Sequence, residues 1–549
     1  MSAAAGPAPA GPGPLGPGEQ PVTARTAPLV DAAGEWAGLR VVVAGVGASG
    51  FAAADALAQR GARVLVVDAR DGEQEREKVR VLDVMDVRAL LGDDAAAALG
   101  GDLPRVDGAA PDLVVTSPGW RPTAPLLAAA AAAGVPVWGD VELAWRLQPP
   151  PGRPGRAPWL AITGTNGKTT TTRMLAAMLS AAGLRTAAVG NVGTPVLHAV
   201  VDPQPYDVLA VELSSYQLHW SSSVAAQSAA VLNLAPDHLD WHGGMEAYAA
   251  AKGRVYEGVE RACVYNVADP VTERLVRGAD VVEGARAVGV TLGVPSVGML
   301  GVVEDVLADR AFVAERSSSA AELGTLEDLL AASGGTGPAP HVVEDALAVA
   351  ALARSHGVPP AAVRDALRGY RPDAHRIALV AEAGGVRWVD DSKATNAHAA
   401  SASLTAFDPV VWVAGGLAKG ASFDELVARH ASRLRGVVLV GLDREPLRSA
   451  LRRHAPEVPV VEVEPSQDAG VAQLAAPPTT DPTTAPGTVL TGRAVMDRAV
   501  ALAGDLARPG DVVLLAPACA SMDQFTDYGA RGDAFAAAVR ARTAGPDGR

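Results

Sequence analysis

Short apolar runs alternate with alanine-rich segments of helical character along most of the chain. Each run is followed by turn residues, which is typical of buried strands. The first four runs lie at residues 40–44, 63–67, 113–116 and 135–138. Strands that alternate with helices predict mostly parallel sheets with helical crossovers, so we expect an α/β fold.

The same alternation appears in two further blocks. The candidate strands of the second block lie at residues 159–163, 207–213, 229–234 and 263–266. Those of the third block lie at residues 387–389, 410–414, 436–440 and 512–516. Residues 278–340 are weakly patterned, and helices are expected after them at 341–356 and 360–367.

Proline- and glycine-rich stretches separate these blocks. The linker QPPPGRPGRAP divides the first block from the second. Low complexity predicts a disordered tail at residues 1–30 and a surface loop at residues 475–488. We expect three α/β domains, at residues 31–148, 155–372 and 373–549.

The amino-acid composition is typical of a soluble globular protein and disfavours several other classes. The chain has 549 residues, 49% hydrophobic and 20% charged, as in ordinary soluble globular proteins. Its 61 acidic and 47 basic side chains leave a formal charge of -14, which disfavours binding to bulk nucleic acid. Two cysteines predict no disulfide framework. The N-terminus resembles neither a signal peptide nor an anchor, so we expect a cytoplasmic protein.

A glycine loop follows the first candidate strand. Gly45, Gly47 and Gly50 have the GxGxxG spacing, and Asp68 closes the next strand. Such glycines let the backbone approach a pyrophosphate at a helix N-terminus. The pattern alone leaves three interpretations open: NAD or FAD binding, UDP-type binding, or a tight turn without a ligand.

A second glycine loop gives a stronger signal. The segment AITGTNGKTTT at residues 161–171 runs from a buried strand through a glycine loop into a helix. This layout cradles ATP phosphates on backbone N–H groups, with Lys168 at the outer phosphates and Thr169 at Mg²⁺. The general pattern has glycine where this chain has Ile162, so the loop is a variant. We expect phosphoryl transfer or other ATP-driven work.

Metal ligands are expected at strand ends that face this loop, because ATP phosphates bind together with divalent metal. Glu212 ends one apolar strand, and His238 follows another. Either residue alone is more often a cap or a surface group than a ligand. Together with the loop upstream, they predict a metal site.

These motifs resemble the muramyl ligases, the ATP-dependent amide-bond ligases of peptidoglycan synthesis. The resemblance covers about residues 39–545 and is carried by GTNGKTT, GNVG, ELSSYQL, LNLAPDHLDWH, AAKGRVYEG, DSKATN, GGLAKG and PACASMDQF. It implies a Rossmann-like UDP-binding domain, a central ATPase domain and a C-terminal Rossmann-like domain for the amino acid. The DSKATN segment resembles the branch that adds D-glutamate to UDP-N-acetylmuramoyl-L-alanine through an acyl phosphate, with release of ADP and phosphate.

The resemblance also implies residue roles. Lys168, His238 and Lys252 are expected to be catalytic. Two Mg²⁺ ions are expected on Thr169, Glu212, His238 and a carbamylated Lys252. The expected contacts to ATP, the cosubstrate, are Gly164, Thr165, Asn166, Gly167, Lys168, Thr169, Thr170, Arg376 and Asp391. The expected contacts to the UDP substrate and D-glutamate are Ser49, Asp68, Arg70, Ser117, Asn191, Lys393, Thr395, Lys419, Ser521 and Tyr528.

Some positions depart from the family pattern. Val342 and Asp345 stand where two asparagines near the adenine are common, and Ala418 stands where an acid commonly precedes the lysine. The departures concern the nucleotide and D-glutamate contacts more than the reaction.

Three alternatives stay open. Another muramyl ligase or a folylpolyglutamate synthase would use the same loop and acids with a different acceptor. A dinucleotide-dependent oxidoreductase would leave the second glycine loop unexplained, and a nucleotide-binding regulator would show no turnover. For the favoured interpretation we expect small-molecule substrates, no nucleic-acid or membrane partner, and a monomer.

Overall fold

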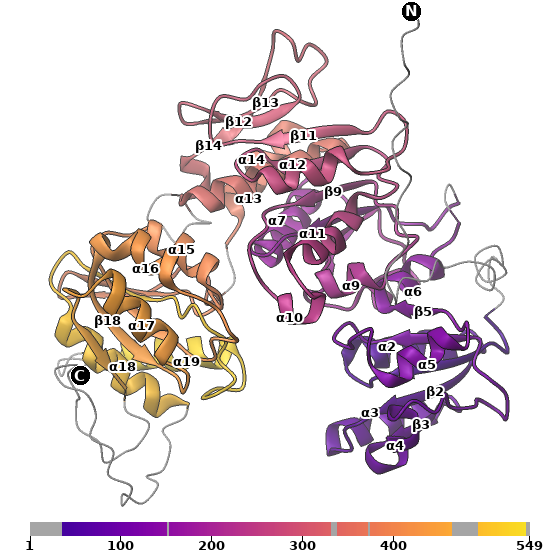
Figure 1. Cartoon of the computed structure of the whole chain (residues 1–549). Coiled ribbons are helices and arrows are strands. Elements are labelled where there is room, and N and C mark those ends of the chain that lie inside the picture. The colour runs from indigo at the N-terminus through magenta and orange to yellow at the C-terminus, as the bar shows by residue number, and fades with distance from the viewer. Residues whose placement is uncertain (1–35, 151–152, 331–337, 372–373, 464–491, 545–549) are drawn as a thin grey trace, which may run out of the picture.

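The computed structural model describes residues 36–150, 153–330, 338–371, 374–463 and 492–544. Three α/β lobes follow one another along the chain: an N-terminal lobe on a five-stranded sheet, a central lobe on a nine-stranded sheet and a C-terminal lobe on a six-stranded sheet (Figure 1). The predicted tail and the low-complexity loop lie outside the described residues. Within the described part, no helix has the length and apolar character needed to cross a membrane.

The N-terminal lobe has parallel strands in the order β3-β2-β1-β4-β5. Its strands are β1 (Arg40–Ala44), β2 (Arg63–Asp68), β3 (Arg88–Leu91), β4 (Leu113–Thr116) and β5 (Val137–Gly139). Its helices are α2 (Ala48–Ala58), α3 (Glu73–Asp83), α4 (Ala96–Leu99), α5 (Pro125–Ala132) and α6 (Asp140–Leu147). The strand order reverses beside β1, the position at which sheets of this kind bind ligands.

The central lobe has the strand order β14-β13-β12-β11-β10-β9-β6-β8-β7, parallel except for the antiparallel pairs at β13. Its strands are β6 (Trp159–Thr163), β7 (Thr186–Gly190), β8 (Val208–Glu212), β9 (Ser228–Val231), β10 (Ala262–Asn266), β11 (Arg286–Val290), β12 (Met299–Val303), β13 (Val306–Asp309) and β14 (Ala321–Thr325). Its helices are α7 (Lys168–Ala181), α8 (Val196–Val200), α9 (Ser215–His219), α10 (Leu239–His242), α11 (Met245–Gly253), α12 (Pro270–Arg277), α13 (Pro340–His356) and α14 (Pro360–Gly369).

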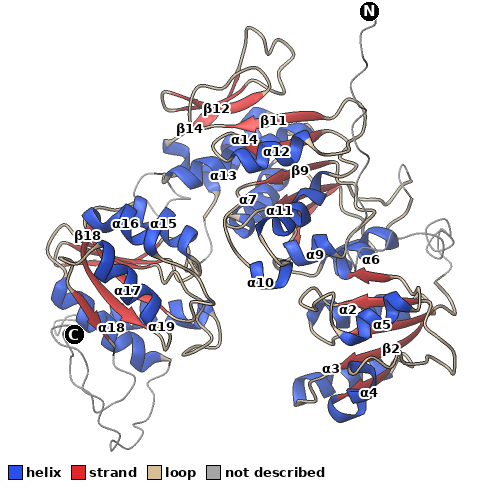
Figure 2. Ribbon diagram, in the orientation of Figure 1, coloured by secondary structure: helices blue, strands red, loops and turns tan. Residues whose placement is uncertain are grey.

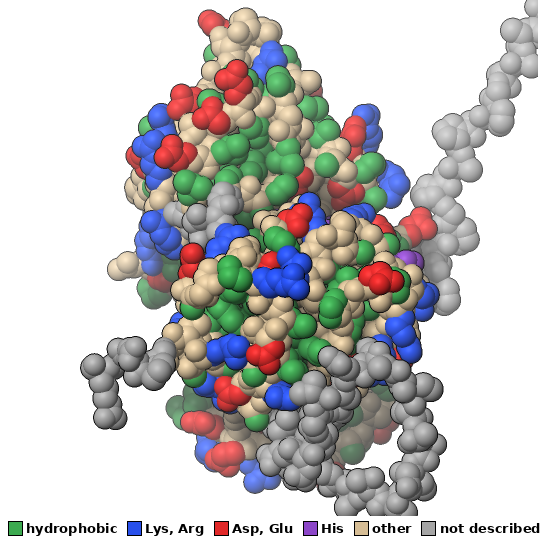
Figure 3. Space-filling view, turned by 90° about the vertical axis from the view of Figure 1, so that its left-hand side faces the viewer, with side chains coloured by type: hydrophobic (Ala, Val, Ile, Leu, Met, Phe, Trp, Pro, Cys, Tyr) green, Lys and Arg blue, Asp and Glu red, His purple; other side chains and the backbone are tan. Residues whose placement is uncertain are grey.

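The C-terminal lobe has the strand order β15-β16-β20-β17-β18-β19, in which only β15 is antiparallel to its neighbour. Its strands are β15 (Ala378–Ala383), β16 (Val386–Asp390), β17 (Val410–Gly415), β18 (Leu434–Val440), β19 (Val460–Glu462) and β20 (Val512–Leu515). Its helices are α15 (Ala397–Thr405), α16 (Asp424–His430), α17 (Glu445–His454), α18 (Arg493–Leu506) and α19 (Tyr528–Thr543). Its described surface mixes basic and acidic side chains on the face seen in Figure 3.

The lobes differ in how they are joined. One hydrophobic cluster runs from Trp138 of the N-terminal lobe to Trp159 of β6, so these two lobes share a core. The other face of the central sheet packs against α7 and α13 in a second cluster. The C-terminal lobe keeps two clusters of its own, one on each face of its sheet. Figure 2 shows the helices of this lobe lying against its strands.

The predicted α/β fold with mostly parallel sheets is confirmed. Every candidate strand is a strand, and those at 40–44, 113–116 and 159–163 match to the residue. The run at 135–138 forms a strand only from Val137, since the Pro136 nitrogen carries no hydrogen for sheet pairing. The described part of the weakly patterned residues 278–340 holds four strands that the apolar pattern did not predict, β11 to β14.

Candidate active site between the central and C-terminal lobes

The loop between β6 and α7, named here the phosphate loop (residues 164–168), stands at the carboxyl edge of the central sheet. Gly164 and Gly167 have φ angles of 155° and 83°. A Cβ at Gly167 would also lie 2.6 Å from a carboxylate oxygen of Asp345. Positive φ and this close approach explain why glycine stands at Gly167. Helix α7 begins at Lys168, at the end of this loop, so its N-terminal N–H groups face the loop and favour an anion there.

A cavity of about 800 Å³ lies beside this loop, between the central and C-terminal lobes. Its volume suits a ligand of nucleotide size. Most of the predicted residues of these two lobes line it. They are Thr165, Asn166, Gly167, Lys168, Thr169, Thr170, Asn191, Glu212, His238, Arg376, Asp391, Lys393, Thr395 and Tyr528.

Lys168 supplies a cation at the base of this cavity. Its Nζ donates to the carbonyl oxygen of Thr165 at 2.8 Å. Burial lowers the pKa of Lys168, while the carboxylates of Glu212 and Asp237 favour its charged form. An ammonium in such a partly dry site attracts phosphate more strongly than one in bulk water.

Glu212 has a buried carboxylate with one free oxygen. The side chain is 1% exposed, and its Oε1 accepts from Asn191 Nδ2 at 2.9 Å. Its Oε2 is buried and, among the described residues, has no hydrogen-bond partner. Because an unpaired buried carboxylate oxygen is costly, a cation here would be stabilising. The position fits a metal ligand.

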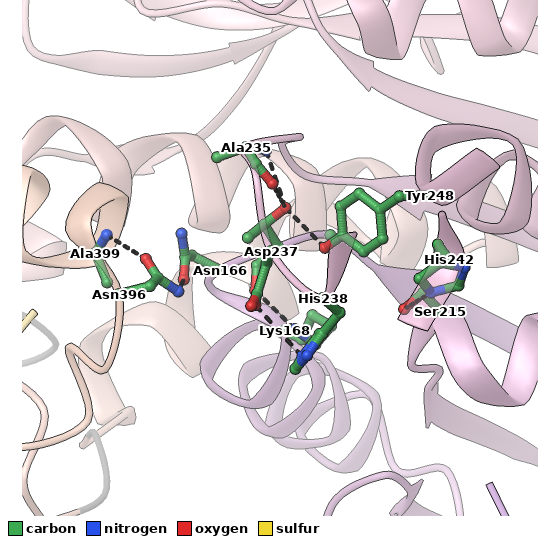
Figure 4. Close-up of polar contacts among 12 residues, drawn as sticks. Asn166, Lys168, Ser215, Ala235, Asp237, His238, His242, Tyr248, Asn396 and Ala399 are labelled. Atoms are coloured by element: carbon green, nitrogen blue, oxygen red, sulfur yellow. Dashed lines mark hydrogen bonds and ion pairs between the residues drawn. The ribbon is translucent and has the colours of Figure 1, made fainter. Parts of the chain in front are cut away.

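His238 lies on the same side of the cavity and has a φ angle of 53°. Its Nε2 is 3.5 Å from Asp237 Oδ2 (Figure 4), and its ring centre is 4.9 Å from that of Tyr216. Burial lowers the pKa of His238, with a further decrease from the charges of Lys419 and Lys168, although Asp237 opposes it. A neutral imidazole keeps a nitrogen free for a metal.

Lys252 lies behind the phosphate loop, outside the lining of the cavity. It is 2% exposed. Its Nζ donates to the Gly164 carbonyl at 2.7 Å and to Thr163 Oγ1 at 3.2 Å. Burial, and next the charge of Lys168, lower the pKa of Lys252 well below its ordinary value. Its surroundings therefore favour the uncharged amine, with a lowered pKa.

The loop after β16 forms the C-terminal wall of the cavity. The Lys393 Nζ lies 3.8 Å from the centre of the Tyr528 ring, and burial, with the charge of Arg376, lowers the pKa of Lys393 to about 8. Asp391 accepts a hydrogen bond from the Ser403 hydroxyl, and burial raises its pKa to about 6. This wall therefore carries a cation, an aromatic ring and a carboxyl group.

Some predicted residues are not brought to the cavity. In the central and C-terminal lobes, Gly164, Lys252, Lys419 and Ser521 do not line it. Lys419 is exposed on the loop after β17, and Ser521 is buried after β20.

The four predicted residues of the N-terminal lobe gather at the carboxyl edge of its own sheet. Asp68 accepts from the Val46 N–H at 2.8 Å and pairs with Arg70 at 3.1 Å. Ser49 Oγ donates to Asp140 Oδ2 at 2.8 Å. Ser117 Oγ is buried and lacks a hydrogen-bond partner within the described part of the chain. These groups form a second polar site, on a different sheet from the phosphate loop.

Several polar residues that line the cavity were not among the predicted site residues, although Asp345 had been noted as a departure from the family pattern. They are Asn233, Asp237, Asn266, His341, Glu344, Asp345, Asn396 and His398. Asn266 ends β10 at the same edge at which Glu212 ends β8, so its position after a buried strand could have indicated it. His341 and Asp345 are four residues apart on α13 and share a face of that helix.

Family models match a segment in each of the three lobes. "Mur ligase MurD-like, N-terminal domain" matches residues 39–139, "Mur ligase middle domain" matches 162–289, and "Mur ligase, glutamate ligase domain" matches 375–519. The chain belongs to the Mur ligase family. The resemblance found in the motifs is thereby confirmed.

Individual Mur ligases are similar to this chain over nearly its whole length. A UDP-N-acetylmuramoylalanine–D-glutamate ligase of Streptomyces avermitilis is 58% identical over 505 residues, which are 92% of this chain and 98% of that protein. The ligase of the same name from Mycolicibacterium smegmatis is 49% identical over 535 residues, 95% of this chain and 99% of that protein.

Solved structures share the Mur ligase fold at lower identity. The UDP-N-acetylmuramate-alanine ligase of Thermotoga maritima has a TM-score of 0.50 at 17% identity and covers 92% of this chain and 100% of its own. A pseudomurein peptide ligase type C from Methanothermus fervidus has a TM-score of 0.50 at 16% identity and covers 91% and 99%. These likenesses concern the fold alone.

Proposed function

We propose that this Mur ligase joins D-glutamate to UDP-N-acetylmuramoyl-L-alanine, with conversion of ATP to ADP and phosphate. The observation that carries the proposal is the cavity in which the phosphate loop, a buried carboxylate and the DSKATN loop meet. The names of relatives up to 58% identical supply the substrates.

The reaction requires two anions, the substrate carboxylate and the γ-phosphate of ATP, to approach each other. Lys168 and Arg376 line the cavity and would offset this repulsion. Transfer of the γ-phosphoryl group gives an acyl phosphate and ADP. The amine of D-glutamate then attacks the acyl carbon, the C–O bond to phosphate breaks, and the amide forms with loss of a proton.

Magnesium fits the donor set of this cavity. The unpaired Glu212 Oε2 is an oxygen ligand of the kind Mg²⁺ prefers. No group of three or more His, Cys, Asp or Glu side chains in the described residues is arranged for one ion, so hydroxyl and carbamate oxygens would be needed as well. We assign Thr169 and Glu212 to one Mg²⁺, and His238 with carbamylated Lys252 to the other. Bound Mg²⁺ would supply Lewis-acid neutralisation of phosphate oxygens.

Carbamylation of Lys252 fits its surroundings. The reaction with CO₂ needs an uncharged amine, and burial favours that form of Lys252. A carbamate nitrogen keeps one N–H, which can still donate to the Gly164 carbonyl. The modification replaces an ammonium next to Lys168 by an anion, which removes a repulsion of like charges.

The other predicted residues take substrate roles in this proposal. Asn191 would position the incoming substrate, and the remaining phosphate-loop residues and Asp391 would contact ATP. The polar site of the N-terminal lobe would hold the uridine nucleotide through Ser49, Asp68, Arg70 and Ser117. The D-glutamate carboxylates or the phosphate would be contacted by Lys393, Thr395, Lys419, Ser521 and Tyr528.

The organisation of the protein is part of the proposal. The lobes would be separate domains at residues 31–148, 155–372 and 373–549, and the enzyme would work as a cytoplasmic monomer on small molecules. Since the cavity draws on two lobes, their relative motion would open and close it.

Phosphate release tests the function. The full chain is incubated with ATP, Mg²⁺ and UDP-N-acetylmuramoyl-L-alanine, together with D-glutamate, L-alanine, diaminopimelate, L-lysine or a folate in parallel. We expect release of phosphate and ADP with D-glutamate only. Release with another amine would indicate a different acceptor specificity, and no release with any of them would contradict the proposed function.

A further inference from the structure

Asn166 of the phosphate loop is fixed to the central sheet through its backbone. Its N–H donates to Asn233 Oδ1 at 2.9 Å, and its carbonyl accepts from Asn233 Nδ2 at 3.2 Å. Asn233 lies just past the end of β9. Two bonds from one amide side chain to the N–H and the carbonyl on either side of the Asn166 Cα fix the direction in which the Asn166 side chain leaves the loop.

That side chain crosses to the C-terminal lobe. Asn396 Nδ2 donates to Asn166 Oδ1 at 3.0 Å (Figure 4). On its other side, Asn166 Nδ2 lies 2.8 Å from His398 Nδ1. Because an amide nitrogen can only donate, His398 Nδ1 is the acceptor and its proton is on Nε2. Burial lowers the pKa of His398, which favours this neutral ring.

On the C-terminal lobe, Asn396 is itself firmly placed. Its Oδ1 accepts from the Ala399 N–H at 2.8 Å and so caps α15. The residues just before it, Lys393 and Thr395, line the cavity. The position of Asn396 relative to the phosphate loop therefore also sets the position of Lys393 and Thr395.

We propose that Asn166, Asn396 and His398 form an interlobe latch. They are positioning residues, which hold the C-terminal wall of the cavity, with Lys393 and Thr395, at a fixed position relative to the phosphate loop. This rests on the proposed function, because it is the D-glutamate lobe that the latch places over the phosphates. The latch is neutral, so it aligns the lobes without adding charge to a cavity that is already lined by charged side chains. Binding of the nucleotide at the phosphate loop and binding of the acceptor at the C-terminal wall are then coupled through the Asn166 side chain.

Three variants open the latch. His398→Ala removes one bond, Asn396→Ser keeps a capping oxygen on α15 but is too short to reach Asn166, and Asn166→Ala removes both bonds. Ser401→Ala is the matched control, since Ser401 lies on the same helix and its 2.8 Å bond to His430 stays within the C-terminal lobe. Thermal melting checks that each variant folds.

Steady-state kinetics give the first readout. We expect His398→Ala and Asn396→Ser to raise the KM for D-glutamate about threefold to tenfold, the range for one lost neutral hydrogen bond. The KM for UDP-N-acetylmuramoyl-L-alanine should stay unchanged, as should all constants of Ser401→Ala. Asn166→Ala combined with His398→Ala should be no worse in D-glutamate KM than Asn166→Ala, because both changes remove the same bond. Additive effects, or an unchanged KM, would overturn the latch.

An interlobe distance gives a readout that does not depend on turnover. Spin labels are attached at Glu283→Cys in the central lobe and Ala428→Cys in the C-terminal lobe, both exposed positions, while the native Cys263 and Cys519 are buried. With ADP present, we expect a broader distance distribution in His398→Ala than in the unsubstituted protein or Ser401→Ala. An identical distribution contradicts the latch even if the ligase reaction is confirmed, and failure of the parent enzyme to use D-glutamate contradicts the proposed function alone.

Discussion

The two glycine loops of this protein have the same local design and different surroundings. Each follows a buried strand and opens a helix, α2 in one case and α7 in the other. In the first loop, the Val46 N–H is taken by Asp68, and the edge around it carries a carboxylate paired with an exposed arginine. In the second, Lys168 is partly buried and the carboxylates of Glu212 and Asp237 favour its charged form by raising its pKa, against the effect of burial. Glycine spacing therefore indicates a backbone that a phosphate can approach, and the neighbouring charges decide which ligand the loop suits.

Removing the cation of the second loop should have the largest effect. We expect Lys168→Ala to lower phosphate release at least a hundredfold to a thousandfold, which is about 3–4 kcal/mol of transition-state stabilisation. The melting temperature should stay close to that of the parent, because Lys168 makes a single bond to its own loop. Turnover near the parent level in a folded variant would refute the role given to the phosphate loop.

The variant Lys252→Ala tests whether catalysis at the second glycine loop depends on the lysine that lies behind it. Lys252→Ala should lose most activity, about a hundredfold, and a small added carboxylate such as formate should restore part of it by occupying the anionic position. Labelled CO₂ should give a carbamate signal in carbon NMR of the parent and none in the variant. Full activity of Lys252→Ala in CO₂-free buffer would make this lysine a structural residue only.

The first loop is expected to take a uridine nucleotide and not NAD⁺. Titration of the full chain should show saturable binding of UDP, and Asp68→Ala should weaken it about tenfold, since Asp68 fixes the loop through Val46. ATP binding at the other lobe serves as the internal control and should not change. Tight NAD⁺ binding without a response to UDP would reverse the interpretation of this loop.

The smallest expected effect is a pH dependence of the KM for ATP, which should arise at the second glycine loop because Asp345 lies beside it. Burial, and next the charge of Glu344, raise the pKa of Asp345 to about 7, and this side chain lies against Gly167. Below pH 7 the carboxyl is mostly protonated, and above it the carboxylate repels ATP. The KM for ATP should therefore rise about threefold to tenfold between pH 6 and 8, and Asp345→Asn should flatten that rise. A parallel dependence in both proteins would show that Asp345 does not titrate against ATP.

How far the sequence predicts this molecule depends on whether a feature is local. The strands at 40–44 and 159–163 contain the continuous apolar runs VVVA and WLAI, so their pattern was sufficient to locate them. β12 (MLGVV) and β13 (VLAD) contain apolar stretches of only two or three residues, and β14 (AELGT) mixes apolar positions with a charged residue and a glycine. Edge strands of this kind form through pairing with neighbours rather than through their own hydrophobicity.

The same distinction holds for the site. Lys168 follows β6 and Glu212 ends β8, and both were found from their local context. Asp345 and His398 reach the cavity from helices of two different lobes, so only the tertiary arrangement brings them to the phosphate loop. Asp345 could be noticed in the sequence as a departure from a family pattern, and that departure says nothing of its contact with Gly167.

The strand order of the C-terminal sheet has a consequence for biosynthesis. β16 and β17 do not pair with each other; each pairs with β20, which the ribosome makes much later. Until residues 512–515 have been translated, two strand edges destined for the middle of the sheet have no partner, and such edges promote aggregation. The N-terminal sheet has no such delay, because all five of its strands are made by Gly139. The nascent chain would therefore carry a finished N-terminal sheet while its last lobe still needs protection from neighbouring chains.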